Sequence, residues 1–428
     1  MAFRDRRRLA ALALVAVLLA ACGSSPVPSA SPTTPAPTLA ATPVLPTTPA
    51  PSVDNNQVVA GIESSVQQIR ELTKKSDVKQ EVLTPAQLTA SIKASFDATN
   101  PPALVAANEK VEKSLGLFPV DASLKDLYVQ LLSSQVAGLY DPDTKTMDVV
   151  SKSGQLGPIE QISYAHEFDH ALQDQNFGLK KLGLDDTSNS DRALARLSLP
   201  EGDATLLMSL WAQKNLTVGQ LLQMAAEASD PSQTAILNSM PDDLRETLLF
   251  PYEQGLTWVS DIHALGGWPA VDAAYASPPD STEQILHFDK WSSHEAPIAV
   301  TIPASLPAKL GPGWTMPLTD TLGELQLRIW LEQVGKVAAT QAVAAAAGWG
   351  GDRIALVEKG NTFGIAIITK WDTPADAVEF AAAAGPTLKL LPSSTAMIDP
   401  GSTNQVVLFI ASDEATINAL AGALGLAG

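Results

Sequence analysis

The sequence predicts an α+β protein: a mainly helical part with a small β element, followed by a smaller α+β part. Apolar residues recur at helical spacing through much of the region after residue 57, whereas strict alternation is confined to short segments. The last third mixes the two patterns. Hydrophobic residues make up 45% of the 428 residues, which is enough to bury sizeable cores.

Charge and cysteine content exclude several classes of protein. The chain has 28 Lys and Arg against 46 Asp and Glu, a net charge of −18, which argues against a nucleic-acid partner. The only cysteine is Cys22, so neither an intrachain disulfide nor a zinc cage of several thiolates can form.

The N-terminus reads as an export signal over residues 1–21. Four arginines precede an apolar run, Leu9 to Ala21, that is too short to span a bilayer comfortably. The run ends in Leu19-Ala20-Ala21-Cys22, which resembles the lipobox of bacterial lipoproteins. That resemblance implies a lipid anchor at Cys22 and an extracytoplasmic protein held on the bacterial cell membrane. A cleaved signal that happens to contain a cysteine is the alternative.

Composition then divides the rest of the chain. Residues 22–56 are rich in Pro, Thr, Ser and Ala, with nothing to bury, and are expected to form an extended stalk after the lipidated cysteine. We expect a first folded domain over residues 57–295 and a second over 296–428.

Local patterns place the individual elements. Residues 58–74 and 85–98 have helical spacing, and residues 136–150 read as a β-hairpin around an Asp-Pro-Asp turn. A helix is expected from Pro158 to about Phe177. In the last third we expect strands at 353–358, 363–369 and 406–410 and helices at 374–384 and 414–424. The Gly-rich stretch 348–353 reads as a turn that enters a strand rather than as a phosphate loop.

The chemistry points to His166-Glu167-Phe168-Asp169-His170, an H-E-x-x-H motif on that helix. Imidazoles at i and i+4 share one face and can bind one tetrahedral metal ion, with Glu167 beside the open coordination position as general base. Two alternatives remain. The histidines could be a buried pair without metal, or the metal could be structural, which normally takes four protein ligands.

A later segment, Leu199-Pro200-Glu201-Gly202-Asp203-Ala204, is expected to open an apolar helix. H-E-x-x-H followed by Glu-Gly-x-Ala resembles the gluzincin clan of zinc metallopeptidases, and the resemblance implies a zincin-like domain that binds Zn²⁺ with Glu201 as third ligand. Gly202 and Ala204 would let this helix approach the histidine helix closely. Alternatively, Glu201 is a solvated acid at a helix N-terminus; Asp203 is the substitute ligand.

The segment Pro251-Tyr252-Glu253-Gln254-Gly255 is similar to the Pro-Tyr-Glu-Lys-Gly stretch of gluzincin aminopeptidases. The similarity implies that the Tyr252 hydroxyl faces the reacting carbonyl; otherwise Tyr252 is a packing residue at a helix start. His263 is the runner-up, because thermolysin-like relatives use a histidine. The hairpin around Gly138 resembles the edge strand that lies along bound peptide in this clan. The Gly-x-Met-Glu-Asn signature of aminopeptidases is absent, so exopeptidase action does not carry over.

Residues 137–291 as a whole resemble uncharacterised bacterial metallopeptidases. The sequence therefore predicts a membrane-anchored, extracytoplasmic zinc metallopeptidase that acts on a peptide or protein substrate. The alternative from another class is a catalytically silent, envelope-binding lipoprotein that retains a structural metal site.

Overall fold

The computed structural model describes residues 55–151, 155–228 and 231–426 and has the predicted α+β class. Cys22, the predicted signal segment and all but the last two residues of the predicted stalk lie outside the described residues. Among the described helices, none combines the length and hydropathy that crossing a bilayer requires.

The elements of the described chain follow one another from Asn55 to Leu424. The helices are α2 (Asn55–Arg70), α3 (Pro85–Thr99), α4 (Pro102–Ser114), α5 (Leu124–Gln135), α6 (Pro158–Phe177), α7 (Ser190–Asn215), α8 (Val218–Ala228), α9 (Pro231–Ser239), α10 (Asp242–Ala274), α11 (Thr282–Leu286), α12 (Phe288–Ser292), α13 (Leu306–Leu310), α14 (Gly323–Gln333), α15 (Ala339–Ala346), α16 (Pro374–Leu388) and α17 (Glu414–Leu424), with a 3₁₀ turn at Leu179–Leu182. The strands are β1 (Lys79–Leu83), β2 (Gly138–Asp141), β3 (Thr146–Val150), β4 (Thr315–Asp320), β5 (Trp349–Lys359), β6 (Thr362–Trp371), β7 (Ser394–Ile398) and β8 (Gln405–Ala411).

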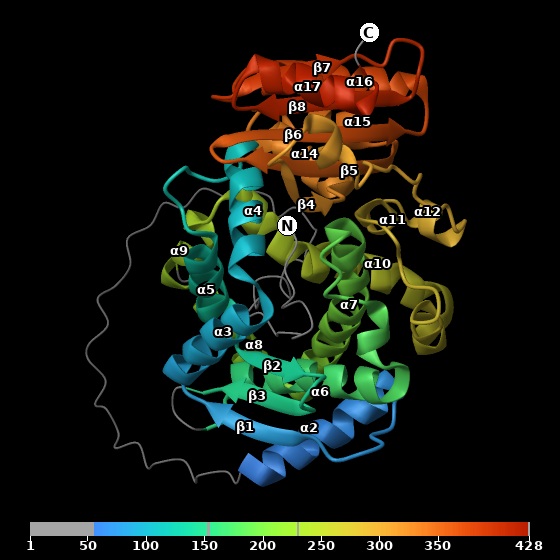
Figure 1. The fold of residues 1–428 in the computed structure, drawn as a ribbon. Helices are drawn as coiled ribbons and strands as arrows, with labels where there is room; N and C mark the ends of the chain where they lie inside the picture. The colour runs from blue at the N-terminus through green and yellow to red at the C-terminus, as the bar shows by residue number, and fades with distance from the viewer. Residues whose placement is uncertain (1–54, 152–154, 229–230, 427–428) are drawn as a thin grey trace, which may run out of the picture.

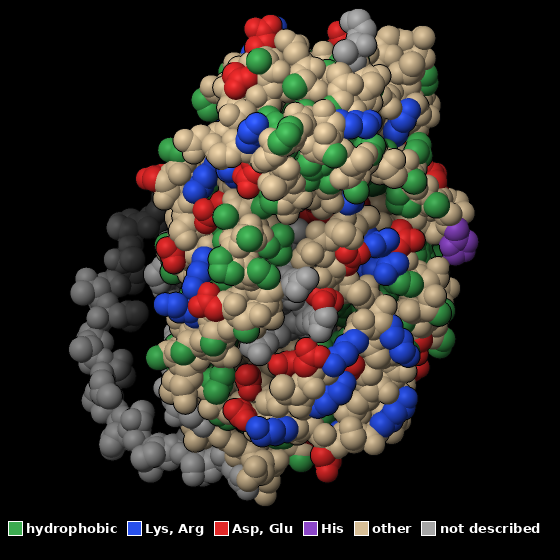
Figure 2. Space-filling model, viewed as in Figure 1, with side chains coloured by type: hydrophobic (Ala, Val, Ile, Leu, Met, Phe, Trp, Pro, Cys, Tyr) green, Lys and Arg blue, Asp and Glu red, His purple; other side chains and the backbone are tan. Residues whose placement is uncertain are grey.

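Two sheets lie at opposite ends of the molecule, with most of the long helices between them (Figure 1). The small sheet β1-β3-β2 lies with α2 and α6 at the lower end of the view, and the larger sheet lies at the upper end with α14 to α17. The helices α7 and α10 pack along each other more extensively than any other pair of helices. On the face of the molecule seen in Figure 1, acidic and basic side chains are interspersed rather than gathered in one basic patch (Figure 2).

The predicted hairpin is present as β2 and β3, which pair antiparallel. The sequence did not predict β1, which extends this sheet by pairing parallel to β3. Because β3 lies between the other two strands, β2 forms an edge of the sheet in the described chain. Met147 and Val149 of β3 are buried toward the helices, and α6 packs against both β2 and β3.

The C-terminal sheet has the order β4-β5-β6-β8-β7 and is antiparallel throughout. Side chains alternate between its two faces. Ile354 and Leu356 belong to the large core shared with the helical part, whereas Ala355 and Val357 pack into a second cluster with residues of α13 and α17. The stretch after Gly348 enters strand β5, as predicted.

Helices α7 and α10, which carry Glu201 and Tyr252, begin earlier in the chain than expected. Helix α7 begins at Ser190, eleven residues before Glu201, and runs through Pro200. Helix α10 begins at Asp242 and runs through Pro251. Glu201 and Tyr252 therefore lie inside buried helices, and neither is at a helix start. The expectation that a helix opens at residues 199–204 is therefore wrong, because this segment lies inside α7.

Gly202 and Gly255 make the close contact between α7 and α10. A Cβ atom added at Gly202 would lie 2.2 Å from the carbonyl oxygen of Gly255, and one added at Gly255 would lie 2.5 Å from the carbonyl oxygen of Ser198. The sequence-based expectation that Gly202 serves the approach of α7 to the histidine helix is therefore wrong. It serves the approach to the tyrosine helix.

Candidate metal centre

The histidines of α6 point to one place. The Nε2 atoms of His166 and His170 lie 3.0 Å apart, and both side chains are buried. The i, i+4 spacing brings the two rings onto one face of the helix, where they meet edge to face. The helical pattern predicted from Pro158 to Phe177 coincides with α6, so this part of the site follows directly from the sequence.

Helix α7 adds Glu201 to this pair. Its Oε2 atom lies 3.2 Å from Nε2 of His166 and 3.4 Å from Nε2 of His170, and only 1% of the side chain is exposed. A buried carboxylate between two imidazoles is not a solvated acid. The structure therefore excludes the alternative role of Glu201 as an exposed helix-terminal charge.

The three atoms fit the donor set and spacing of a zinc site. Ligand atoms about 2.0–2.1 Å from one tetrahedral zinc ion lie roughly 3.3 Å from each other. The three separations are 3.0, 3.2 and 3.4 Å. Two nitrogens and one oxygen leave a fourth tetrahedral position for water or substrate, which is the arrangement of catalytic rather than structural zinc sites.

The cluster also has the electrostatics of a cation site. Burial lowers the pKa of His166, whereas burial of His170 is outweighed by the Glu201 carboxylate, which raises the His170 pKa to about 9. Burial alone would raise the pKa of Glu201, but the positive charge of His170 and hydrogen bonds to both histidines lower it to about 2. Without metal, a proton on His170 thus balances the Glu201 charge.

Glu167 lies beside the cluster under strand β2. It is fully buried, and its charge contributes to raising the pKa values of both His170 and Tyr252. A Cβ atom added at Gly138 would lie 2.7 Å from Cγ of Glu167 and 3.2 Å from its Oε1. The glycine therefore lets the backbone of the edge strand pass directly over the carboxylate.

Helix α10 brings Tyr252 to the other side of the cluster. Its ring stacks on His166 with centroids 6.3 Å apart, and only 6% of the residue is exposed. Burial, the charges of Glu201 and Glu167 and a hydrogen bond to Glu201 raise the pKa of Tyr252 well above 10, so its hydroxyl keeps its proton. The structure thus brings together five sequence-predicted residues: His166, Glu167, His170, Glu201 and Tyr252.

The two substitute residues lie elsewhere. His263 is eleven residues beyond Tyr252 on α10, roughly 16 Å along the helix, and its ring packs on Trp268. Asp203 is fully buried in an ion pair with Arg70, whose Nε lies 2.7 Å from Oδ1, while Oδ2 accepts from Arg70 and from Tyr275. Both oxygens of Asp203 are therefore occupied.

No role was predicted for the residues that surround the ligands. Gln173 bonds to His170, Asp169 and Pro200, and its only sequence signal is its place three residues after His170 on the same helical face. Arg70 is a fully buried arginine that follows Ile62 and Val66 at helical spacing. A lone basic residue in an apolar stripe is a signal for a buried ion pair.

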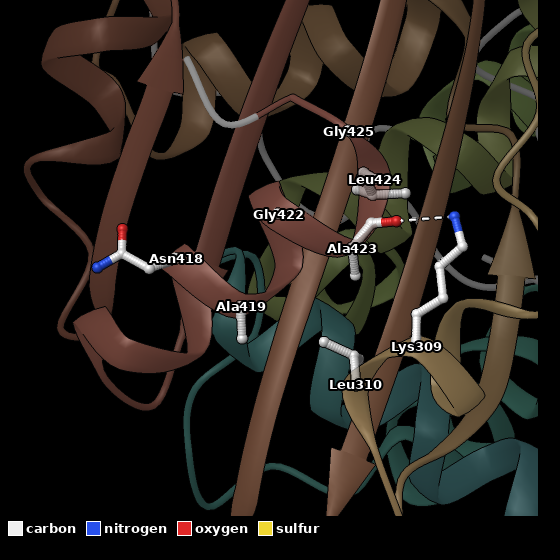
Figure 3. Close-up of a pocket in the computed structure, with 8 residues that line it drawn as sticks. All are labelled: Lys309, Leu310, Asn418, Ala419, Gly422, Ala423, Leu424 and Gly425. Carbon is white, nitrogen blue, oxygen red and sulfur yellow. Dashed lines mark hydrogen bonds between the residues drawn. The ribbon is translucent and has the colours of Figure 1, made fainter.

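Two other places in the described chain lack this chemistry. Glu283, Glu295 and Asp372 form an acidic cluster, but the Lys290 ammonium pairs with all three at 2.5–3.0 Å and supplies the cation. A depression between α13 and α17 is lined mainly by small and apolar residues (Figure 3). Its Lys309 ammonium donates to the carbonyl of Ala423 at 3.0 Å.

Fold and site together define an α+β protein with a buried His-His-Glu cluster between two of its helices. A family model described as "Domain of unknown function (DUF8575)" matches residues 313–415. The matched segment spans β4 to β8 and contains none of the cluster residues. No curated protein and no solved structure matches the chain significantly.

Proposed function

We propose that the protein is a zinc-dependent metallopeptidase in which His166, His170 and Glu201 hold the metal. The single observation that carries the proposal is the convergence of these three buried ligand atoms within 3.4 Å of one another. A zinc ion held there would act as a Lewis acid toward a water molecule and toward the peptide carbonyl.

The protein's own residues supply the remaining steps. Glu167 takes a proton from the attacking water and then passes it to the leaving amine, because its carboxylate is buried beside the ligands. The Tyr252 hydroxyl donates a hydrogen bond to the charge that develops on the carbonyl oxygen. A phenol with a raised pKa suits this role, since it must remain protonated.

Strand β2 supports a peptide as the substrate. It is an edge strand in the described chain and passes over Glu167 at Gly138. An edge strand can pair with an extended peptide through backbone hydrogen bonds. A peptide paired in this way would run past the general base with its carbonyls at regular spacing.

Glu167→Gln tests the proposal. The variant keeps shape and polarity but cannot accept the proton, so we expect about one zinc per chain to remain while cleavage of a peptide library disappears. Zinc content is measured by elemental analysis and cleavage by mass spectrometry. Wild-type protein that binds zinc but cleaves nothing would instead support the catalytically silent, envelope-binding lipoprotein. Wild-type protein that binds no zinc would refute both.

We also propose that Cys22 anchors the protein on the outer side of the cell membrane, on the basis of its lipobox-like context. Stable anchoring takes two signals, for which two acyl chains suffice. Labelling with a radioactive fatty acid should mark the wild-type protein and leave Cys22→Ser unlabelled. Label that persists on the serine variant would contradict the anchor.

A further inference from the structure

The side-chain amide of Gln173 links the two helices that supply the ligands. Its Nε2 lies 2.9 Å from Oδ2 of Asp169 and 3.1 Å from the carbonyl oxygen of Pro200, and its Oε1 lies 2.9 Å from Nδ1 of His170. Gln173 is fully buried. One amide thus contacts a metal-ligand candidate on α6 and the backbone immediately before Glu201 on α7.

These contacts determine which way the amide faces. A backbone carbonyl only accepts hydrogen bonds, so the nitrogen of Gln173 must face Pro200, and the oxygen must then face His170. An amide oxygen also only accepts, so Nδ1 of His170 carries a proton. Neutral His170 therefore has its lone pair on Nε2, the atom that faces His166 and Glu201.

We propose that Gln173 is the positioning residue of the metal centre, holding His170 with its Nε2 lone pair toward the metal and fixing α6 against the α7 backbone that carries Glu201. This inference rests on the proposed metal-binding function. His166 differs, because its Nδ1 has no hydrogen-bond partner among the described residues. Of the two histidines, only His170 is thus held through its Nδ1 atom by a described residue.

The test compares two glutamines of α6 in the full chain. Gln173→Met preserves side-chain length and removes the amide. Gln175→Met is the matched control, because the Gln175 amide bonds to Lys75 and Ser76 in the loop after α2 and not to the cluster. Zinc affinity is measured by competition with a chelator. Exchange of the His170 Nδ1 proton is followed by NMR with ¹⁵N-labelled histidine, which gives signals from only five residues.

We expect Gln173→Met to weaken zinc binding by about 10–100-fold, as loss of a hydrogen bond to a metal-ligating histidine does. It should also lose the slowly exchanging Nδ1 proton, whereas Gln175→Met should change neither. Wild-type zinc affinity in Gln173→Met, or a proton that stays protected, would overturn the proposal. The proton is observable in metal-free protein, so this readout decides whether Gln173 holds the Nδ1 proton of His170 even if the wild-type chain fails to bind zinc, a result that would refute the proposed function instead.

A second variant separates orientation from packing. Gln173→Glu keeps an oxygen for the His170 proton but loses both donors. We expect that proton to stay protected, with a zinc affinity between those of the wild type and Gln173→Met. Zinc binding as weak as in Gln173→Met would show that the acceptor does not orient His170.

Discussion

Gly202 on α7 and Gly255 on α10 bring the backbones of these two helices into direct contact. The contact has a functional consequence, because Glu201 precedes one glycine and Tyr252 lies three residues before the other. A hydrogen bond joins these two side chains across the helix pair. The glycines therefore set the distance between a metal-ligand candidate and the candidate oxyanion donor.

Gly202→Ala should destabilise the protein by roughly 1–3 kcal/mol or more, because the new methyl group would meet backbone, which cannot move aside as a side chain can. Gly61→Ala is the control. Gly61 is an exposed position of α2 with nothing within 4 Å of an added Cβ, so the same change there should stabilise by about 0.5–1 kcal/mol. Urea unfolding measures both values, and equal effects would contradict the packing argument.

Tyr252→Phe should retain zinc and fold and lose roughly 10²–10³ in kcat, since it removes one hydrogen-bond donor to charge that develops only in the transition state. KM should change little. Steady-state kinetics on a cleaved peptide provide the measurement, with His263→Ala as a control that should keep wild-type turnover. Full activity in Tyr252→Phe would assign the oxyanion to another donor.

Asp203→Asn should cost about 3–5 kcal/mol of stability, because it leaves the buried Arg70 guanidinium with less opposing charge. Zinc stoichiometry should stay at one per chain. Asp280→Asn, which removes a half-exposed partner of Arg196, should cost no more than about 1 kcal/mol. Elemental analysis and thermal unfolding separate the two roles, and loss of zinc in Asp203→Asn would make it a ligand after all.

Zinc binding should compete with one proton. The pKa of His170 rises from 6.5 to about 9 in the folded, metal-free protein, whereas His166 and Glu201 have lowered values and are already deprotonated near neutral pH. Apparent zinc affinity should therefore rise about tenfold per pH unit between 6.5 and 9 and then level off. Chelator competition at several pH values measures this slope. A flat profile would mean that no ligand proton is displaced.

The raised pKa of His170 also makes the stability of the metal-free fold depend on pH: stability falls as the pH rises, whereas zinc affinity increases. Because folded His170 binds its proton more tightly than the unfolded chain does, its contribution to stability is full below pH 6.5 and is lost as the pH rises through 9. Chelator-treated protein should therefore unfold in progressively less urea across this range. Zinc-loaded protein has no such proton to lose at His170, which provides the comparison.

The parts of the site that follow from local spacing could be predicted from sequence. Helix α6 and the hairpin of β2 and β3 came from periodicity and turn residues, and the i, i+4 histidines came with them. Glu201 and Tyr252 were found through resemblance, because nothing in a single sequence states that segments 35 and 86 residues beyond His166 return to it.

The rest depends on tertiary packing. Strand β1 reads as a polar segment because its pattern is almost wholly exposed, and it is a strand only because β3 lies alongside. Pro200 and Pro251 lie inside helices because burial of the helical residues on both sides of each proline outweighs the cost of its missing backbone N–H group. The partners of Arg70 lie on helices far along the chain, which no local pattern encodes.

The large core runs without interruption across the boundary predicted at residue 296. Helix α14 packs on α10 and α11, and its Trp330 donates a hydrogen bond to the carbonyl of Leu115 at 3.1 Å. A gene fragment that stopped after residue 295 would encode every candidate catalytic side chain, yet its product would expose the apolar surface that α14 covers. Such a fragment would be expected to aggregate on expression, because α14 covers apolar surface of α10, the helix that carries Tyr252.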